Sequence, residues 1–192
     1  MAPMSVLPEI LAHNAAFVAH KEYETFLTSP TPDKRLVVIS CMDTRLVELL
    51  PKAMGIRNGD VKLIKTAGAV VSSPFGSVMR SVMVAVYQLG AQEIVVVGHY
   101  GCGMTNLSAT EVLDKARKRG IAPQIFTTLD HAGVNLQHWL RGFESPQAGV
   151  LASVEMIRNH PLLPKDIVVH GLIMQPDTGH LDVVTTGVHP DP

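Results

Sequence analysis

The sequence predicts an α/β fold with a central, mainly parallel β-sheet flanked by helices. Three observations point to it: short apolar runs rich in β-branched residues, helical patterns between those runs, and chemically distinctive residues where two of the runs end. Strands that alternate with helices form βαβ units, and a sheet covered on both faces needs strands that are apolar throughout. The elements along the chain support this interpretation in order.

The chain begins with a helical pattern. Apolar side chains in residues 1–30 recur at helical spacing, which predicts an N-terminal arm of one or two helices. The segment "SPTPDK" then interrupts the pattern, and strands begin to alternate with helices. We expect strands at 35–41, 61–68 and 93–99, separated by helices at 46–55 and 76–90.

Beyond residue 104 the pattern becomes helical again. Helices are predicted at 109–120, 127–143 and 147–160. The cations of "KARKR" precede Gly120, which is ordinary chemistry for the C-terminus of a helix with a glycine cap. Two strand-like runs around "QPDTGHL" predict a final hairpin whose first arm completes the sheet. Because no linker interrupts the sequence, we expect one domain over residues 1–192.

Composition and charge narrow the classes of partner. Hydrophobic residues make up 46% of the chain and charged residues 17%, which is apolar for a soluble monomer and suggests burial in an oligomer. The formal charge of −1 argues against a nucleic-acid partner. The apolar runs are far shorter than the roughly 20 residues of a membrane span, and the N-terminus lacks the features of a secretory signal. We therefore expect no membrane association and a cytoplasmic location.

Two predicted strands end in residues that carry chemistry. "VVISCMDTR" delivers Cys41, Asp43 and Arg45, and "VVVGHYGCG" delivers His99 and Cys102. Ligand-binding and catalytic residues of open parallel sheets gather beyond the carboxyl ends of the strands. Two thiolates and an imidazole match the ligand set of a catalytic zinc site whose fourth position is open. The alternative is structural, because a cysteine at a strand end is usually a small buried hydrophobe.

Other motifs compete for the same residues. "GCGMTN" resembles a dinucleotide-binding fingerprint, but Asn106 stands where the third glycine is needed. Cys41 and Arg45 resemble a phosphatase loop, but the three residues between them are too few to cradle an oxyanion. Cys41 and Cys102 are the two cysteines of the chain, so no disulfide framework exists, although one bridge remains open. Metal binding, catalysis and core packing are the remaining interpretations of these cysteines.

"CMDTR" followed by "HYGCG" resembles the signature of the β-class carbonic anhydrases, Cys-x-Asp-x-Arg with His-x-x-Cys. "TAGAVV" and "VHGLIMQPDTGHL" also resemble segments of that family, and the likeness runs from about residue 35 to residue 186. The resemblance implies a zinc-containing α/β fold and a homodimer or homotetramer. It also implies that the N-terminal helices pack on a partner subunit.

The resemblance further implies a role for each residue of the signature. Cys41, His99 and Cys102 would bind one Zn²⁺ per subunit, and Asp43 and Arg45 would form a catalytic pair in which Arg45 orients Asp43. In a closed state of the site, Asp43 would itself bind zinc as a fourth ligand. The implied reaction is attack of zinc-bound hydroxide on carbon dioxide to give bicarbonate. Four other histidines are conceivable proton relays, and none is assigned: His131, His138, His170 and His180.

The surroundings of the substrate are less well defined by the sequence. Ala67, Gly68, Ala69 and Val70 are expected to line a narrow apolar approach, with a simple strand-to-helix turn as the alternative. The stretch "SPTPDKR" lacks a glutamine that many β-class members carry before the first zinc cysteine. The short chain also resembles a compact subgroup of the family that includes carbonyl sulfide hydrolases. Carbonyl sulfide is therefore the alternative substrate, and a non-catalytic zinc-binding protein is the least favoured interpretation.

Overall fold

The structure is a computed structural model that describes residues 5–188, and the chain divides into two compact units, one ending at Pro30 and one beginning at Thr31. The first unit contains α1 (Leu7–Ala19) and the short 3-10 helix η1 (Glu22–Phe26), which confirms the predicted helices. The ring centroids of Phe17 and Phe26 lie 6.2 Å apart and connect the two helices. That 1–192 form a single domain, and that the arm packs on a partner subunit, remain predictions.

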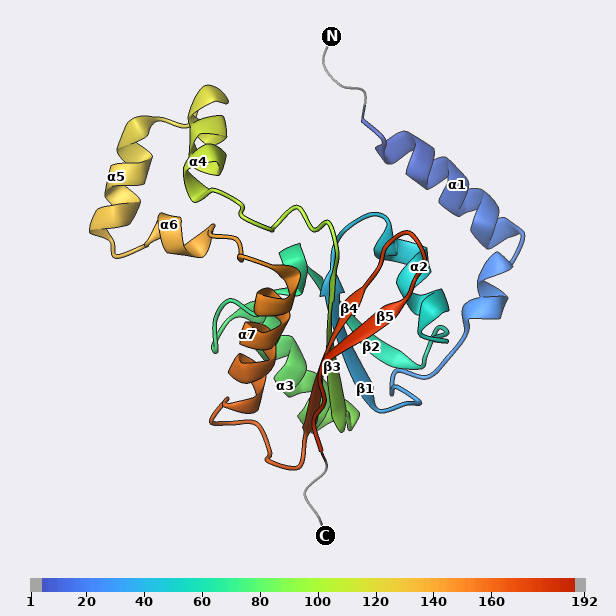
Figure 1. Cartoon of the computed structure of the whole chain (residues 1–192). Coiled ribbons are helices and arrows are strands. Elements are labelled where there is room, and N and C mark those ends of the chain that lie inside the picture. Colours follow the sequence, from blue (N-terminus) through green and yellow to red (C-terminus); the bar gives the residue numbers. More distant parts are fainter. Residues whose placement is uncertain (1–4, 189–192) are drawn as a thin grey trace. The chain divides into compact units, whose positions relative to one another are not determined.

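The described part of the second unit is built on a five-stranded sheet of order β2-β1-β3-β4-β5 (Figure 1). The first four strands in this order are parallel, and the last pairs antiparallel to its neighbour. The strands are β1 (Leu36–Cys41), β2 (Val61–Thr66), β3 (Glu93–His99), β4 (Val168–Met174) and β5 (Leu181–Thr185). The predicted α/β class and the final hairpin are confirmed.

One strand is shorter than predicted. The expected strand at 61–68 ends at Thr66, where a short 3-10 turn, η2 (Ala67–Ala69), begins. Gly68 and Ala69 have φ angles of 71° and 59°, which lie in the left-handed region and cannot continue a strand.

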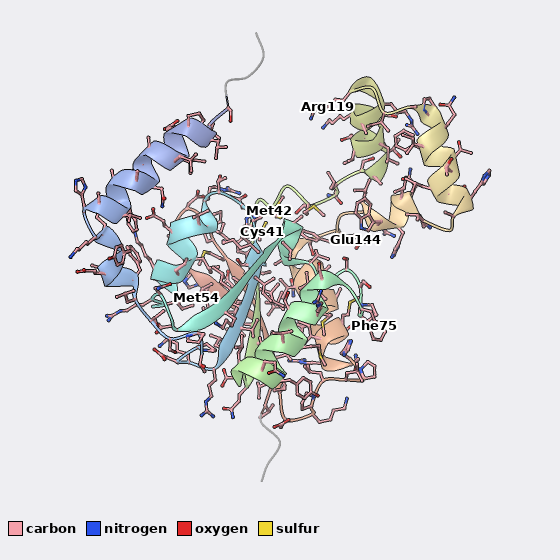
Figure 2. The ribbon with its side chains drawn as sticks, turned by 180° about the vertical axis from the view of Figure 1, so that it is seen from behind. Cys41, Met42, Met54, Phe75, Arg119 and Glu144 are labelled. Atoms are coloured by element: carbon pink, nitrogen blue, oxygen red, sulfur yellow. The ribbon has the colours of Figure 1, made fainter. Side chains whose placement is uncertain are left out.

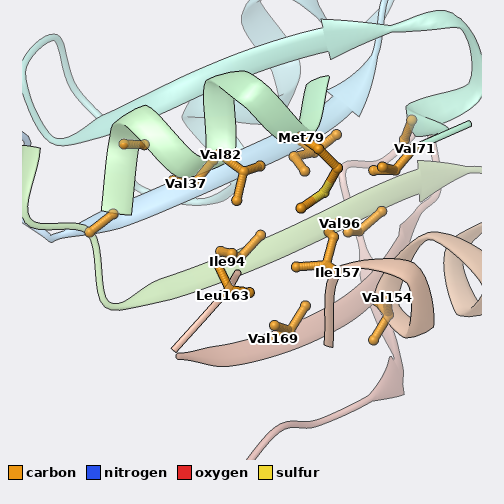
Figure 3. Packing of buried hydrophobic residues seen from close by; sticks show 14 of the residues in the cluster. Val37, Val71, Met79, Val82, Ile94, Val96, Val154, Ile157, Leu163 and Val169 are labelled. Atoms are coloured by element: carbon orange, nitrogen blue, oxygen red, sulfur yellow. The ribbon is translucent and has the colours of Figure 1, made fainter. Parts of the chain in front are cut away.

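Alternation along the strands divides the core between the two faces of the sheet. Val37 points to one face and Val38 to the other, and both are fully buried. Helices α3 (Ser77–Leu89) and α7 (Pro146–Arg158) cover the first face, and α2 (Leu46–Ala53) covers the second. Figure 3 shows the packing on the first face around Met79, Val82, Val96, Val154 and Ile157. The sheet is thus buried on both faces, as its apolar strands predict.

A helical excursion lies between β3 and α7 in the chain. It contains α4 (Ala109–Lys118), α5 (Pro123–His131) and α6 (Leu136–Trp139). The basic last turn of α4 leads to Gly120 at a φ of 97°, as expected. The single helix predicted over 127–143 is wrong. Gly133, at a φ of 82°, opens a turn that separates α5 from α6, because a left-handed residue cannot continue a right-handed helix.

Two glycines allow α7 to approach the sheet closely. A Cβ atom on Gly98 of β3 would lie 2.7 Å from Cγ2 of Val150 in α7. A Cβ atom on Gly171 of β4 would lie 2.6 Å from Cγ1 of the same valine. Both distances are too short for carbon atoms in contact, so Val150 occupies the space that side chains at these two strand positions would need.

We expect Gly98→Ala to lower the free energy of unfolding by about 1–3 kcal/mol, because it overpacks the contact between β3 and α7. Adding Val150→Ala should relieve the clash, so that the double variant loses at least about 1 kcal/mol less than the sum of the single losses. Urea unfolding at a fixed zinc concentration measures all three variants. Strictly additive losses would contradict this account of the packing.

Candidate metal centre

Three potential metal ligands meet at the carboxyl end of the sheet, where Figure 2 shows Cys41. Cys41 is the last residue of β1, His99 is the last residue of β3, and Cys102 lies in the turn that follows. Their ligand atoms all lie within 4.8 Å of one another, and all three residues are buried. Because β1 and β3 are adjacent parallel strands, their carboxyl ends coincide, and residues far apart in the sequence come together.

The spacing of the two sulfur atoms suits a shared metal ion. Cys41 Sγ and Cys102 Sγ are 3.9 Å apart, and both cysteines are free. Two thiolates bound tetrahedrally at about 2.3 Å from one zinc ion would lie about 3.8 Å apart, whereas a disulfide requires about 2.05 Å. The disulfide that the sequence left open is therefore not formed in this structure.

The ring of His99 presents one nitrogen to the cluster. Nδ1 lies 2.9 Å from the carbonyl oxygen of Tyr100, a contact that assigns the proton to Nδ1 and leaves a lone pair on Nε2. Within the described residues Nε2 is buried and has no hydrogen-bond partner. The Asp43 Oδ2 atom lies 3.7 Å from it. A buried acceptor without a partner is costly, so Nε2 fits a metal ligand.

Backbone amides surround the two sulfur atoms and affect their ionisation. Backbone hydrogen bonding from Asp43 and Gly68 favours the thiolate of Cys41, and that from Met104 favours the thiolate of Cys102. Burial alone would raise the pKa of Cys41, but the contact with His99 and the two amides outweigh burial and lower this pKa. Burial raises the pKa of Cys102, and the neighbouring charge of Cys41 raises it further. Cys41 is therefore the more readily ionised thiol.

Asp43 and Arg45 form a bidentate ion pair beside these ligands. Arg45 Nε donates to Asp43 Oδ1 and Arg45 Nη2 to Asp43 Oδ2, each over 2.9 Å. The Arg45 backbone N–H also donates to Oδ1 over 3.0 Å. The paired guanidinium holds the pKa of the Asp43 carboxyl well below its usual range, so this carboxylate is an anion at neutral pH.

Arg45 also connects the two ligand-bearing loops. Besides its bonds to Asp43, its Nη2 atom donates to the carbonyl oxygen of Gly101 over 3.2 Å. Gly101 lies between His99 and Cys102 and has a φ of 64°, a conformation that favours glycine. The arginine therefore fixes the loop after β1 against the turn after β3.

Lys65 contacts the site, although the sequence analysis does not single it out. Its Nζ atom donates to Ser40 Oγ over 3.4 Å and to the Cys41 carbonyl oxygen over 3.5 Å. Burial lowers the pKa of Lys65, while the charges of Cys41 and Asp43 oppose that shift. A partly buried lysine in a strand of apolar residues is a signal that sequence reasoning could have used.

Met104 and Phe143 are the other contacts that the sequence analysis missed. A Cβ atom on Gly68 would lie 2.7 Å from Cε1 of Phe143 and 3.0 Å from Cγ of Met104. Phe143 arrives from the far end of the helical excursion, where Thr105 and Phe143 form a β-bridge. Nothing in the local sequence around Phe143 signals this contact, because it exists only through tertiary packing.

The predicted approach residues form the η2 turn and the residue after it. Gly68 and Ala69 are buried there, and Ala67 and Val70 are partly exposed. The backbone amide of Gly68 favours the thiolate of Cys41, while the lining of a substrate path by Ala67–Val70 remains a prediction.

The four histidines that the sequence offers as proton relays lie outside the cluster of ligand atoms. His170 Nε2 lies 3.9 Å from Glu93 Oε2, and His180 Nε2 lies 3.4 Å from Asp182 Oδ1. His131 ends α5 and His138 belongs to α6. The structure therefore identifies no proton relay among them.

Comparison with known proteins agrees with this arrangement. Residues 36–181 match the family model described as carbonic anhydrase. The structure of β-carbonic anhydrase isoform I from Trichomonas vaginalis aligns with a TM-score of 0.86 and 34% sequence identity, covering 96% of this chain and 100% of that one. The chain belongs to the β-carbonic anhydrase family. The predicted family resemblance is thus confirmed, and membership makes the chain an enzyme of this family.

The relatives of this β-carbonic anhydrase chain carry two kinds of name. It is 54% identical over 187 residues to "Putative carbonic anhydrase YvdA" of Bacillus subtilis (strain 168), covering 97% of the chain and 95% of that protein. It is 30% identical over 175 residues to a carbon disulfide hydrolase of Acidithiobacillus thiooxidans, covering 86% of the chain and 85% of that protein. Family membership therefore fixes the fold and the class of chemistry but leaves the substrate to be tested.

We expect Cys41 of the metal-free protein to react with iodoacetamide faster than Cys102 at neutral pH. The two residues are almost equally buried, with 5% and 6% exposure, so the thiolate fraction rather than access decides the rates. As the pH rises, the Cys41 rate should reach its plateau at a lower pH, because the pKa of Cys41 is lowered and that of Cys102 is raised. Peptide mapping by mass spectrometry measures both rates, and faster alkylation of Cys102 would contradict the assignment.

Proposed function

We propose that this β-carbonic anhydrase binds one Zn²⁺ per subunit through Cys41, His99 and Cys102 and hydrates carbon dioxide to bicarbonate. The observation that carries the proposal is the buried His99 Nε2 atom, which has no hydrogen-bond partner in the described part of the chain and lies within 4.8 Å of two free thiols. Sulfur and imidazole ligands favour zinc over magnesium or calcium. The relatives named as carbonic anhydrases support the choice of substrate.

When bound, zinc would act as a Lewis acid that lowers the pKa of a coordinated water and so provides a nucleophile at neutral pH. Asp43 would orient this water molecule. Its Oδ2 atom lies 3.7 Å from His99 Nε2 and would accept a hydrogen bond from the attacking water, which leaves an oxygen lone pair free for the carbon of the substrate. Arg45 keeps the carboxylate ionised and fixed in this orientation.

The ion pair between Asp43 and Arg45 favours the open state of the site over the closed state. Arg45 engages both carboxylate oxygens of Asp43, at 2.9 Å each. For Asp43 to become a fourth metal ligand, it would have to give up at least part of this pairing. The structure therefore supports the open state, in which Asp43 orients water instead of displacing it.

Hydration of carbon dioxide consumes one water molecule and yields bicarbonate and one proton. Asp43 is a weak acceptor for that proton, because its pKa lies well below the usual range. The proton must therefore pass to another acceptor, such as buffer.

Carbonyl sulfide is a second candidate substrate on the same scaffold. The relatives named as carbon disulfide hydrolases support it, since carbon disulfide and carbonyl sulfide are both linear molecules with an electrophilic carbon. Attack of water on carbonyl sulfide at that carbon yields carbon dioxide and hydrogen sulfide. The apolar contacts of Met104 and Phe143 with Gly68 would suit either uncharged substrate.

The proposed assembly is a homodimer or homotetramer in the cytoplasm. In the single chain several apolar side chains of the first unit are more than half exposed: Val6, Leu7, Ile10, Leu11, Val18, Phe26 and Leu27. An exposed apolar face of this kind favours burial against another subunit. Within residues 5–188, no helix combines the length and apolarity needed to cross a membrane.

We expect Cys102→Ser to lose both bound zinc and carbon dioxide hydration, while Asp43→Ala keeps zinc and loses activity by about 10²-fold or more. Elemental analysis and stopped-flow hydration measure the two properties. Glu48→Gln is the matched control, because it removes a carboxylate whose partner, Lys52, forms an exposed surface pair at 2.9 Å. Wild-type turnover in Asp43→Ala would show that Asp43 does not orient the water.

The choice between substrates is measured by offering carbon dioxide and carbonyl sulfide to the same zinc-loaded preparation. We expect a higher kcat/KM for carbon dioxide, followed by stopped-flow, than for carbonyl sulfide, followed by hydrogen sulfide release. The Asp43→Ala variant should lower both activities, because the same water attacks both substrates. A preparation that releases hydrogen sulfide but does not hydrate carbon dioxide would assign the protein to the alternative function.

A further inference from the structure

We propose that Ser153 of α7 is a positioning residue of the metal centre, which holds the η2 turn so that the Gly68 amide points at the Cys41 sulfur. The inference rests on the proposed role of Cys41 as a zinc ligand. Ser153 is 1% exposed, and its Oγ atom accepts a hydrogen bond from the Val71 N–H over 3.1 Å. The hydroxyl lies 2.9 Å from the Gly149 carbonyl oxygen and 3.4 Å from that of Ala69, within reach to donate to either.

The η2 turn needs this support because its backbone is strained. Ala69 has a φ of 59°, a left-handed conformation that costs roughly 1–2 kcal/mol for a residue with a Cβ atom. Such a conformation persists only where the surroundings fix it. Ser153 contacts the backbone at the strained residue, Ala69, and two residues beyond it, at Val71. From the strand side, Thr66 Oγ1 donates to the Val70 carbonyl oxygen over 3.3 Å and closes the turn.

The η2 turn also positions Gly68, one of the two residues whose backbone amides favour the thiolate of Cys41. Cys41 pairs with Thr66 in the register of β1 and β2, and the Met42 N–H donates to the Thr66 carbonyl oxygen over 2.9 Å. Gly68 follows two residues after Thr66, and its backbone amide favours the thiolate of Cys41. The ring of Phe143 leaves no room for a Cβ atom on Gly68, so the turn is confined on that side as well.

A simpler role for Ser153 would be local. Serine hydroxyls inside helices often donate to the carbonyl oxygen four residues earlier, and Ser153 can do so with Gly149. The bond from Val71 is different, because it satisfies a buried amide of another element, 82 residues away in the sequence. Ser81 of α3 provides the comparison: its hydroxyl donates to the Ser77 carbonyl oxygen over 2.9 Å, and the residue is exposed.

The test compares Ser153→Ala with Ser81→Ala as the matched control and Ser153→Thr as the conservative variant. Zinc affinity is measured by competition with a chromophoric chelator, under conditions in which circular dichroism shows each metal-free protein to be folded. We expect the zinc affinity of Ser153→Ala to fall about tenfold, a typical loss when support behind a metal ligand is removed. Ser81→Ala should match wild type, and Ser153→Thr should stay within about twofold, because it keeps the hydroxyl.

A second readout separates positioning from general destabilisation. In cobalt-loaded protein, the thiolate-to-metal charge-transfer band reports the electron density on sulfur, so loss of an amide donor should shift this band in Ser153→Ala and leave it unchanged in Ser81→Ala. If Ser153→Ala does not fold, Ser153→Cys replaces it as a variant with a weak acceptor of similar size.

Two outcomes would overturn the proposal. A folded Ser153→Ala protein with wild-type zinc affinity and an unchanged cobalt band overturns the role of Ser153 alone. A wild-type chain that binds no zinc overturns the proposed function, and this inference with it.

Discussion

The parallel pairing of β1 with β3 is the constraint on which the site depends. Val38 lies opposite Val95 and Ser40 opposite Val97, which brings the ends of the two strands together. A slip of one residue would move every buried side chain of a strand to the opposite face of the sheet. The paired register of β1 and β3 therefore fixes more than the core: it also fixes Cys41 relative to His99. Stability and metal-site geometry depend on the same register.

Around this constraint the site is assembled from competing electrostatic effects. Burial disfavours the thiolate at both cysteines. At Cys41 the contact with His99 and the backbone amides of Asp43 and Gly68 outweigh burial, whereas at Cys102 burial and the charge of Cys41 outweigh the amide of Met104. A pair in which one thiol ionises easily can begin to bind a cation before the second proton is lost. Arg45 contributes a positive charge and also links the two loops, since it contacts Asp43 on one loop and Gly101 on the other. Replacing it with a lysine would keep the charge but lose the fork that makes both contacts.

The residues that follow strands in short motifs were predictable, because the carboxyl ends of adjacent parallel strands meet, whereas contacts made only through helix packing were not. Cys41, Asp43 and Arg45 follow one strand within five residues, so a motif records them. The helix predicted over 127–143 failed because apolar spacing continues across Gly133, whose left-handed φ ends the helix. Ser153 belongs to a correctly predicted helix, but its bond to Val71 spans 82 residues and leaves no local pattern.

Residues in short motifs and residues that meet only through packing lie on different elements. This difference helps to explain how one fold occurs in relatives named for different substrates. The proposed metal ligands lie at the ends of β1 and β3, where Cys41, His99 and Cys102 are all buried. Met104 and Phe143, which pack on Gly68, come instead from the two ends of the helical excursion. A change within the excursion can move these two side chains without changing the register that holds the ligands. The surroundings of the proposed substrate approach can therefore vary while the proposed metal ligands stay in place, because the two depend on different structural elements.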